Sequence, residues 1–494
     1  MCAAGARATG SAERPPTVRQ FTDGQICLTM SKIVSMRGLL TSSIGATCAT
    51  ALALPLTLTA TPATAATATA AAASEAAASP GSTRSLPLTP LTPERVLGTA
   101  PVQGLYRPDG EHFSLVGVVW DDPDTALRGR VQVRTRSATT GKWSGWQDVE
   151  VHNADHGADP GTAERGAPRV RGATAPLWVG DAEGVDVRVR ADGAAAGARG
   201  SRAAGPRRPR VPLPSGLRLQ LVDPGGQAPP EGALPKGMPV DDPHTDLDTD
   251  AARAASNANT DVTDYGALEI PALGKRATEE ELIRLKGPVK GKPHIGARPR
   301  IVTRRGWGAD EEVREGGFIY TKKIKAVFVH HTASGNKYTC AEAPSVIRSI
   351  YRYHVDSMGW RDIGYNFLVD KCGTIYEGRA GGVAKAVLGA HTLGFNNSSM
   401  GVAVIGTYGT AKPPKAALTA IAKLSAWKLG LYGVNPRGKT YLTSAGGNLY
   451  AKGKKVRLNV ISGHRDGFAT ECPGDRLYAK LGTARSSAAR YQGR

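Results

Sequence analysis

The chain contains 494 residues, long enough for roughly two or three domains that each bury a core of their own. Its formal net charge of +20 points to a polyanionic partner such as a cell-wall polymer, a membrane surface or a nucleic acid. The basic residues are spread along the chain apart from "RRPR" at 207–210, and no basic-helix or zinc-finger motif is present, which argues against nucleic-acid binding.

The N-terminal region has the features of a secretory signal. A positive flank precedes the apolar run "ATALALPLTLTA", and the small residues of "PATAATA" suit cleavage after them. We assign 1–68 to a signal region whose true start is Met30 or Met36, followed by a mobile leader at 69–87. The apolar run is too short and too interrupted to span a membrane, and no transmembrane segment is found elsewhere, so we expect a secreted protein, extracellular or associated with the cell wall.

Residues 88–223 carry the pattern of an all-β, sandwich-like accessory domain. Apolar runs such as "HFSLVGVVW", "RVQVRTR" and "VDVRVR" alternate with period two between Gly, Asp and Pro, which is typical of half-buried antiparallel strands. The two tryptophans of "GKWSGW" either pack at the edge of the core or form a platform for a sugar. The composition of 224–297 predicts a linker with one short helix at Thr278 to Gly287, begun by a capping box of Thr278 and Glu281.

From residue 298 the pattern changes to that of a compact α/β domain, assigned to 298–485, with a tail at 486–494. "KAVFVHHT" and "SMGVAVIGTY" are predicted to be buried strands, and "YNFLVDKCGTIYEGR" a hairpin. "KAALTAIAKLSAWKLGLYG" predicts an amphipathic helix that ends at Gly433.

Histidines and a cysteine in this domain form a candidate metal site. His330 and His331 end the apolar strand "AVFV", and adjacent strand residues face opposite sides, so only one of them can enter a given site. Together with His464 and Cys472, that one histidine would make a His₂Cys set, which suits tetrahedral zinc with a fourth position for water. A histidine at a strand end can equally be a core residue, and spacing alone leaves both interpretations open.

Beyond the signal region the chain has three cysteines, Cys340, Cys372 and Cys472. Because the number is odd, at most one intramolecular disulfide can form in a secreted chain, and one thiol needs another role.

Ordered motifs resemble those of a known family. "VFVHHTAS", "GWRDIGYNFLVD", "GTIYEGR", "GAHTLGFNNSSMGVAVIG" and "GHRDGFATECPG" occur in the order found in peptidoglycan recognition proteins, which are similar to zinc N-acetylmuramoyl-L-alanine amidases of phage endolysins. The match covers about 300–480 and implies a central mixed β-sheet flanked by helices. The preceding β-domain and linker resemble those of secreted amidases from high-GC bacteria.

The resemblance implies a zinc hydrolase that cleaves the amide bond between N-acetylmuramic acid and L-alanine in peptidoglycan. His330, His464 and Cys472 match the Zn²⁺ ligands, so the remaining Cys340 and Cys372 are left to form a disulfide. Tyr365 matches the catalytic tyrosine, which would stabilise the developing oxyanion, and Thr470 matches the threonine of active family members. No carboxylate in these motifs matches a general base.

The same resemblance places a set of residues along a cleft for the muramyl peptide: His354, Gly359, Trp360, His391 and Asn396. Gly359-Trp360 matches the dipeptide that accompanies diaminopimelate-type stems in animal relatives. His354 could instead cap its helix and Asn396 could serve a turn, while Arg379 could steer a peptide carboxylate or form a structural ion pair.

The alternative function is a module that binds peptidoglycan without cleaving it, as family members lacking the zinc cysteine do. The presence of Cys472, Tyr365 and Thr470 favours catalysis. The positive charge predicts an additional attraction to anionic cell-wall polymers.

Overall fold

The computed structural model describes residues 81–91, 102–107, 110–151, 155–192, 212–226, 247 and 249–494. The predicted signal region and the basic run at 207–210 lie outside these residues. Across the described ranges, no helix combines the length and apolar character needed to cross a membrane.

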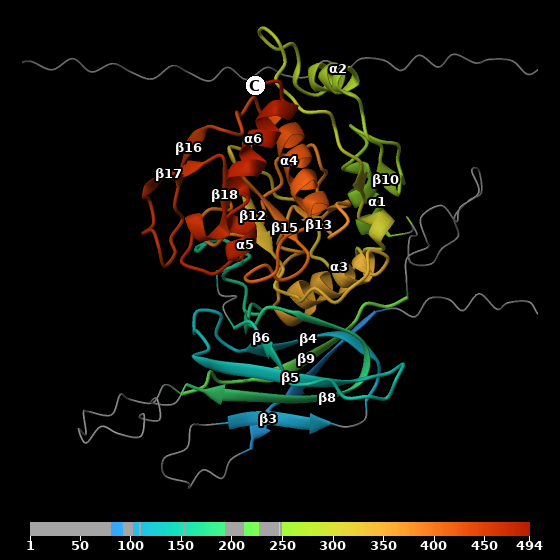
Figure 1. Ribbon diagram of the computed structural model, residues 1–494, viewed down its shortest axis with the longest axis vertical. Coiled ribbons are helices and arrows are strands. Elements are labelled where there is room, and N and C mark those ends of the chain that lie inside the picture. The colour runs from blue at the N-terminus through green and yellow to red at the C-terminus, as the bar shows by residue number, and fades with distance from the viewer. Residues whose placement is uncertain are drawn as a thin grey trace, which may run out of the picture. The chain divides into compact units, whose positions relative to one another are not determined.

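The described residues between 81 and 226 form an antiparallel β-domain (Figure 1). Its strand order is β1-β9-β4-β8-β3-β2, while β5 pairs with β8 and β6, and β7 pairs with β4. Alternate side chains of β4 and β5, including Val116, Val118 and Val131, pack in one buried cluster, so the predicted all-β class is confirmed. The strands are β1 Ser82–Pro87, β2 Thr89–Pro90, β3 Val102–Arg107, β4 Phe113–Trp120, β5 Gly129–Ser137, β6 Gln147–Val149, β7 Gly172–Ala173, β8 Leu177–Ala191 and β9 Arg218–Asp223.

Two boundaries differ from the predicted ones. The β-domain begins before 88, because β1 pairs along its whole length with β9 and is therefore part of the sheet rather than of a mobile leader. The predicted linker contains the helices α1 (Asp250–Asn257) and α2 (Lys275–Lys286) and the strand β10 (Glu269–Ile270), which extends the sheet of the α/β domain. The helix α2 begins three residues before Thr278, whose hydroxyl donates to the carbonyl of Gly274 instead of capping the helix.

The α/β domain is built on a mixed sheet with the order β10-β11-β14-β13-β15-β12-β18. The strand β12 lies parallel to β15 on one side and to β18 on the other. A separate antiparallel pair, β16 and β17, forms a hairpin before the His464 motif. The strands are β11 Ile301–Val302, β12 Ala326–His331, β13 Phe367–Val369, β14 Ile375–Glu377, β15 Ser399–Val404, β16 Lys439–Thr443, β17 Lys455–Asn459 and β18 Ile461–Gly463. The helical elements are η1 Arg305–Trp307, α3 Ala343–Arg352, η2 Tyr353–Ser357, α4 Lys415–Gly430, η3 His464–Asp466, α5 Asp475–Tyr478 and α6 Leu481–Tyr491.

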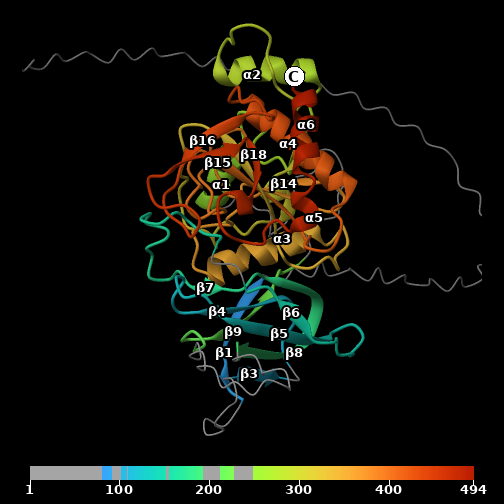
Figure 2. The same cartoon turned by 60° about the vertical axis from the view of Figure 1, so that its left-hand side comes forward.

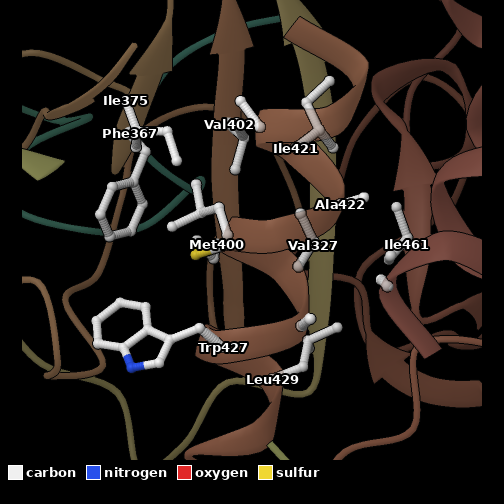
Figure 3. Close-up of a cluster of buried hydrophobic side chains, with 14 of the residues drawn as sticks. Val327, Phe367, Ile375, Met400, Val402, Ile421, Ala422, Trp427, Leu429 and Ile461 are labelled. Atoms are coloured by element: carbon white, nitrogen blue, oxygen red, sulfur yellow. The ribbon is translucent and has the colours of Figure 1, made fainter. Parts of the chain in front are cut away.

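Side chains alternate between the two faces of this sheet. Val327 and Val402 contribute to the core formed with Ile421 and Trp427 of α4, and this packing is visible in Figure 3. The helices α4 and α6 lie side by side over this face (Figures 1 and 2). The opposite face, which includes Ala403, packs towards α3. The mixed sheet flanked by helices is therefore confirmed.

The β-domain and the α/β domain each have a hydrophobic core of their own, and a further hydrophobic core is shared between them. Leu115 and Val222 of the β-domain belong to the same buried cluster as Ile350 and Tyr353 of the α/β domain. The Tyr353 hydroxyl donates to the carbonyl of Thr174 at 3.0 Å. Burial of apolar surface common to two domains favours one docked arrangement over independent motion.

A disulfide joins Cys340 and Cys372, which are 32 residues apart, and the free cysteine in the described residues is the buried Cys472. We expect the double substitution Cys340→Ser/Cys372→Ser to lower the free energy of unfolding by about 3–4 kcal/mol, because the unfolded chain regains the entropy of an open loop. Urea unfolding followed by circular dichroism measures the change. Wild-type protein in reductant should show the same loss, and an unchanged midpoint in both cases would contradict the prediction.

Candidate functional site

The register of β12 brings two of the predicted ligands together. Val329 of β12 pairs with Gly463 of β18, so His330 and His464, each the next residue along, become neighbours. Their ring centroids are 4.6 Å apart. His331 lies on the other face, where its Nδ1 accepts from the backbone N–H of Tyr408 at 3.2 Å. Only His330 therefore enters the site, as strand geometry requires.

Cys472 completes the predicted triad, and a third histidine from the β-domain joins it. The Cys472 Sγ lies 3.7 Å from His330 Nδ1, and the loop carrying it returns to η3 through a hydrogen bond from the Arg465 N–H to the Cys472 carbonyl. Ligand atoms of His156, His330, His464 and Cys472 all lie within 4.8 Å of one another, and all four residues are buried.

The chemistry of these four groups fits a zinc ion. His464 Nδ1 and His156 Nε2 are buried without a hydrogen-bond partner, which is costly unless another group meets them. Burial, opposed by the carboxylate of Asp155, lowers the pKa of His464 to about 3, and burial together with His464 lowers the pKa of His330. Both imidazoles are therefore neutral and able to bind a metal. Imidazole nitrogens and a cysteine sulfur are ligand types that zinc binds, so this donor set fits the ion.

Neighbouring groups orient the candidate ligands. The hydroxyl of Thr392 lies 3.4 Å from His330 Nε2, and His464 Nε2 lies 3.1 Å from the backbone carbonyl of Asp155. Asp155 also lies 3.1 Å from His156 Nδ1 through its carboxylate. Each histidine thus has one nitrogen within hydrogen-bonding distance of a polar partner, and the other lies among the candidate ligands. The Asp155 carboxylate also lies 3.6 Å from His464 Nδ1.

Tyr365 and Thr470 lie next to the cluster. The ring centroid of Tyr365 is 5.5 Å from that of His330. Burial, reinforced by Cys472 and Asp155, raises the pKa of Tyr365, so its hydroxyl stays protonated and can donate a hydrogen bond. The Thr470 hydroxyl accepts from the backbone N–H of Cys472 at 3.1 Å and thereby shapes the loop that carries this cysteine.

The predicted cleft residues also gather around the cluster. His354, in the π-turn η2, stacks against Trp360 with ring centroids 4.5 Å apart, and its Nδ1 accepts from the Gly364 N–H at 3.2 Å. His391 lies 5.2 Å from His330 between ring centroids. Asn396 accepts from the backbone N–H groups of His391 and Thr392 through its side-chain oxygen, so it does shape a turn.

The β-domain contacts several of these cleft residues directly. The side-chain amide of Asn396 donates to the Gly157 carbonyl at 2.9 Å and to the Asp159 carboxylate at 2.7 Å. Gly359 adopts a φ of +74°, and a Cβ there would lie 2.1 Å from the Arg169 carbonyl oxygen. Glycine at 359 therefore permits the close approach of the β-domain backbone.

Arg379 forms a buried ion pair. It holds Glu164 of the β-domain at 2.7 and 2.9 Å in a bidentate arrangement, and its Nε donates to the Ile363 carbonyl. The structure therefore shows Arg379 in an ion pair. Its partner carboxylate belongs to the β-domain.

Sequence reasoning missed the segment that supplies these contacts. Asp155, His156, Asp159 and Glu164 lie in "HNADHGADPGTAERG", between β6 and β7. This stretch shows no strand or helix periodicity and matches none of the family motifs. One signal was available: a connection of this length without regular structure is uncommon in a compact domain and is often functional.

Two family profiles match the two domains of this chain. A family profile described as N-acetylmuramoyl-L-alanine amidase matches residues 320–475, and one described as Rv3811 N-terminal galactose-binding domain-like matches residues 64–210. Peptidoglycan-recognition protein SC2 of Drosophila simulans is 31% identical over 183 residues, which is 37% of this chain and 85% of that protein. The N-acetylmuramoyl-L-alanine amidase of Homo sapiens is 34% identical over 191 residues, which is 37% of this chain and 28% of the human protein. Among solved structures, Drosophila PGRP-LB wild-type matches with 28% identity and a TM-score of 0.30 over 37% of this chain and 92% of that chain.

The fold and the site define an amidase-type α/β domain preceded by a galactose-binding-like β-domain. The chain belongs to the family of peptidoglycan recognition proteins and N-acetylmuramoyl-L-alanine amidases. A function related to peptidoglycan follows from this membership.

The contact between Thr392 and His330 yields a prediction. We expect Thr392→Val to weaken zinc binding about 10-fold, because His330 loses the hydroxyl that fixes its ring while the side-chain volume is kept. Competition with a chromogenic chelator measures the affinity. Ser399→Ala is the matched control, since the Ser399 hydroxyl lies 3.4 Å from His391, a histidine outside the candidate ligand set. Equal affinities in all three proteins would show that Thr392 does not orient His330.

Proposed function

We propose that the protein is a zinc-dependent N-acetylmuramoyl-L-alanine amidase, which hydrolyses the amide bond between N-acetylmuramic acid and L-alanine in bacterial peptidoglycan. The observation that carries this proposal is the buried cluster of His330, His464 and Cys472 beside the Tyr365 hydroxyl, in a domain of the amidase family. These three side chains form no ion pair with one another, and core packing alone does not require three potential metal ligands at one place.

His330, His464 and Cys472 would hold the metal. Zinc, when bound, supplies Lewis-acid chemistry that activates water for attack on an amide carbonyl. Burial raises the pKa of the Cys472 thiol, so this residue must release its proton on binding the metal. The two histidines are already neutral and release none.

The Tyr365 hydroxyl would stabilise negative charge on the amide oxygen. Its raised pKa keeps the proton in place near neutral pH, and the buried surroundings strengthen a hydrogen bond from this donor. Thr470 would act through the Cys472 loop, which its hydroxyl holds through the Cys472 N–H.

His354, Trp360, His391 and Asn396 would bind the muramyl peptide, because they lie around the cluster. Gly359-Trp360 supports a diaminopimelate-type stem, as in relatives that carry the same pair. The disulfide between Cys340 and Cys372 supports an oxidising, extracellular location, and we propose a secreted or wall-associated enzyme.

Digestion of purified peptidoglycan tests the activity. We expect the full chain to bind about one zinc per molecule and to release free stem peptides with new L-alanine amino termini, detected by mass spectrometry. Cys472→Ala should lose both zinc and activity. Tyr365→Phe should keep zinc but lose about 10²-fold in rate, the scale of removing one oxyanion donor. New reducing sugar ends without freed L-alanine termini would identify a glycosidase instead.

A peptidoglycan-binding module without hydrolysis is the second candidate, since several relatives are named as recognition proteins. It predicts binding to insoluble wall by wild type and Cys472→Ala alike, with no fragment released by either protein. The amidase proposal predicts release by wild type only.

The positive charge suggests retention at anionic wall polymers. Exposed charges interact over a Debye length of only about 8 Å at physiological ionic strength, so we expect added salt to release the protein from whole walls. Turnover of a small soluble muramyl peptide should fall much less, because the cleft is buried. Sedimentation of walls at increasing salt measures retention. Salt-independent retention would favour specific sugar binding by the β-domain.

A further inference from the structure

The β-domain segment 155–171 occupies the positions that a substrate would need. It supplies His156 to the metal cluster, Gly157 and Asp159 to Asn396, and Glu164 to Arg379. Each contact joins a candidate functional residue of the α/β domain to a residue more than 150 positions away in the chain.

His156 changes the character of the metal site. A catalytic zinc site has three protein ligands and keeps one position open, whereas four protein ligands are typical of a closed, structural site. The imidazole of His156 lies 4.6 Å from His464 and 5.4 Å from His330 between ring centroids, and 5.8 Å from Tyr365. It therefore lies where water and the amide carbonyl would have to enter.

The cleft is closed beside the cluster as well. Asn396 uses both donors of its amide on the segment, and the Asp159 carboxylate also accepts from the Gly394 N–H at 2.8 Å. Trp360 lies 3.7 Å from the position of a Cβ on Gly157. These polar groups cannot bind a muramyl peptide while they bind the segment.

Glu164 presents a carboxylate to the guanidinium of Arg379. Both side chains are almost fully buried, at 5% and 7% exposure, and the Arg361 N–H donates to the same carboxylate at 3.3 Å. A stem peptide also carries carboxylates, so Glu164 imitates the chemistry of the ligand that this cleft would take.

The segment is anchored on both sides. Ala158 and Val170 belong to the hydrophobic core shared by the two domains, and Arg169 donates to the Gly359 carbonyl at 3.0 Å. An occupant tethered in this way competes with substrate at a high effective concentration.

We propose that the β-domain keeps the amidase latent, with 155–171 as an intramolecular occupant of the cleft and His156 as the fourth ligand of the metal. This proposal rests on the proposed function. Full activity then requires displacement of the segment. The wild type hydrolyses only in proportion to its fraction of open molecules, which reduces its apparent affinity for a muramyl peptide by the same fraction.

Cobalt substitution of the full chain tests the fourth ligand without measuring turnover. Azide changes the visible spectrum of Co²⁺ only where it can reach the metal. We expect no change in the wild type and a clear change in His156→Ala. The matched control, Asp148→Ala, removes an exposed carboxylate of the β-domain paired with Arg130 and should behave as the wild type. An equal azide response in wild type and His156→Ala would overturn the proposal.

Ligand binding tests the occupied cleft. A soluble muramyl peptide should bind His156→Ala/Asp159→Ala/Glu164→Gln at least about 10-fold more tightly than wild type or Asp148→Ala, measured by calorimetry, because the open fraction rises. The triple variant should also release stem peptides from peptidoglycan faster than wild type or Asp148→Ala. Wild-type binding as tight as that of the triple variant, or a loss of activity in His156→Ala with its metal retained, would refute latency.

The two proposals fail in different ways. If the azide response and peptide binding change as expected but no variant releases stem peptides, the latency inference stands and the amidase activity is wrong. If wild type and the triple variant release stem peptides at equal rates, the activity stands and the latency inference is wrong. Circular dichroism and the retained cobalt spectrum confirm that the variants are folded.

Discussion

The parallel pairing of β12 with β15 and β18 is the constraint on which the site depends. It places His330 beside His464, because the backbone ladder sets the spacing of the two residues. The apolar residues before them hold the strand from both faces. Neutral imidazoles can then be buried together, which would be costly if either carried a charge.

A buried ionic network supports the neighbouring loop. Arg304 pairs with Glu311 at 2.7 Å and with Asp362 at 3.1 Å, and the Asp362 carboxylate accepts from the Ala380 N–H. Burial disfavours the charged guanidinium, but Asp362 and Glu311 outweigh it and raise the pKa of Arg304. Buried pairs of this kind contribute little net stability, but they define the geometry of the chain that carries Arg379.

The sequence allowed the α/β domain and the proximity of its three candidate ligands to be predicted, because these residues lie inside ordered motifs. His330, Tyr365 and Cys472 lie together as that pattern implied. The role of His156 could not be predicted in the same way. Its contacts depend on the docking of two domains, and nothing local in its segment marks the partner. The predicted linker was too long for a related reason. The strand β10 spans too few residues for an alternation of apolar and polar side chains to be recognised in the sequence.

Metal binding and domain docking are coupled if His156 belongs to the metal site. A ligand that binds the docked state more tightly than the open one stabilises docking, and by reciprocity docking raises the affinity for that ligand by the same factor. The shared core already favours the docked state, because Ala158 and Val170 lose apolar contacts when the segment leaves. Opening therefore removes three interactions together: the contact of His156 with the other candidate ligands, the Arg379–Glu164 pair and this apolar burial. A partner that displaces the segment must replace most of these interactions at once, which a polymer carrying carboxylates and amide groups along its length is chemically able to do.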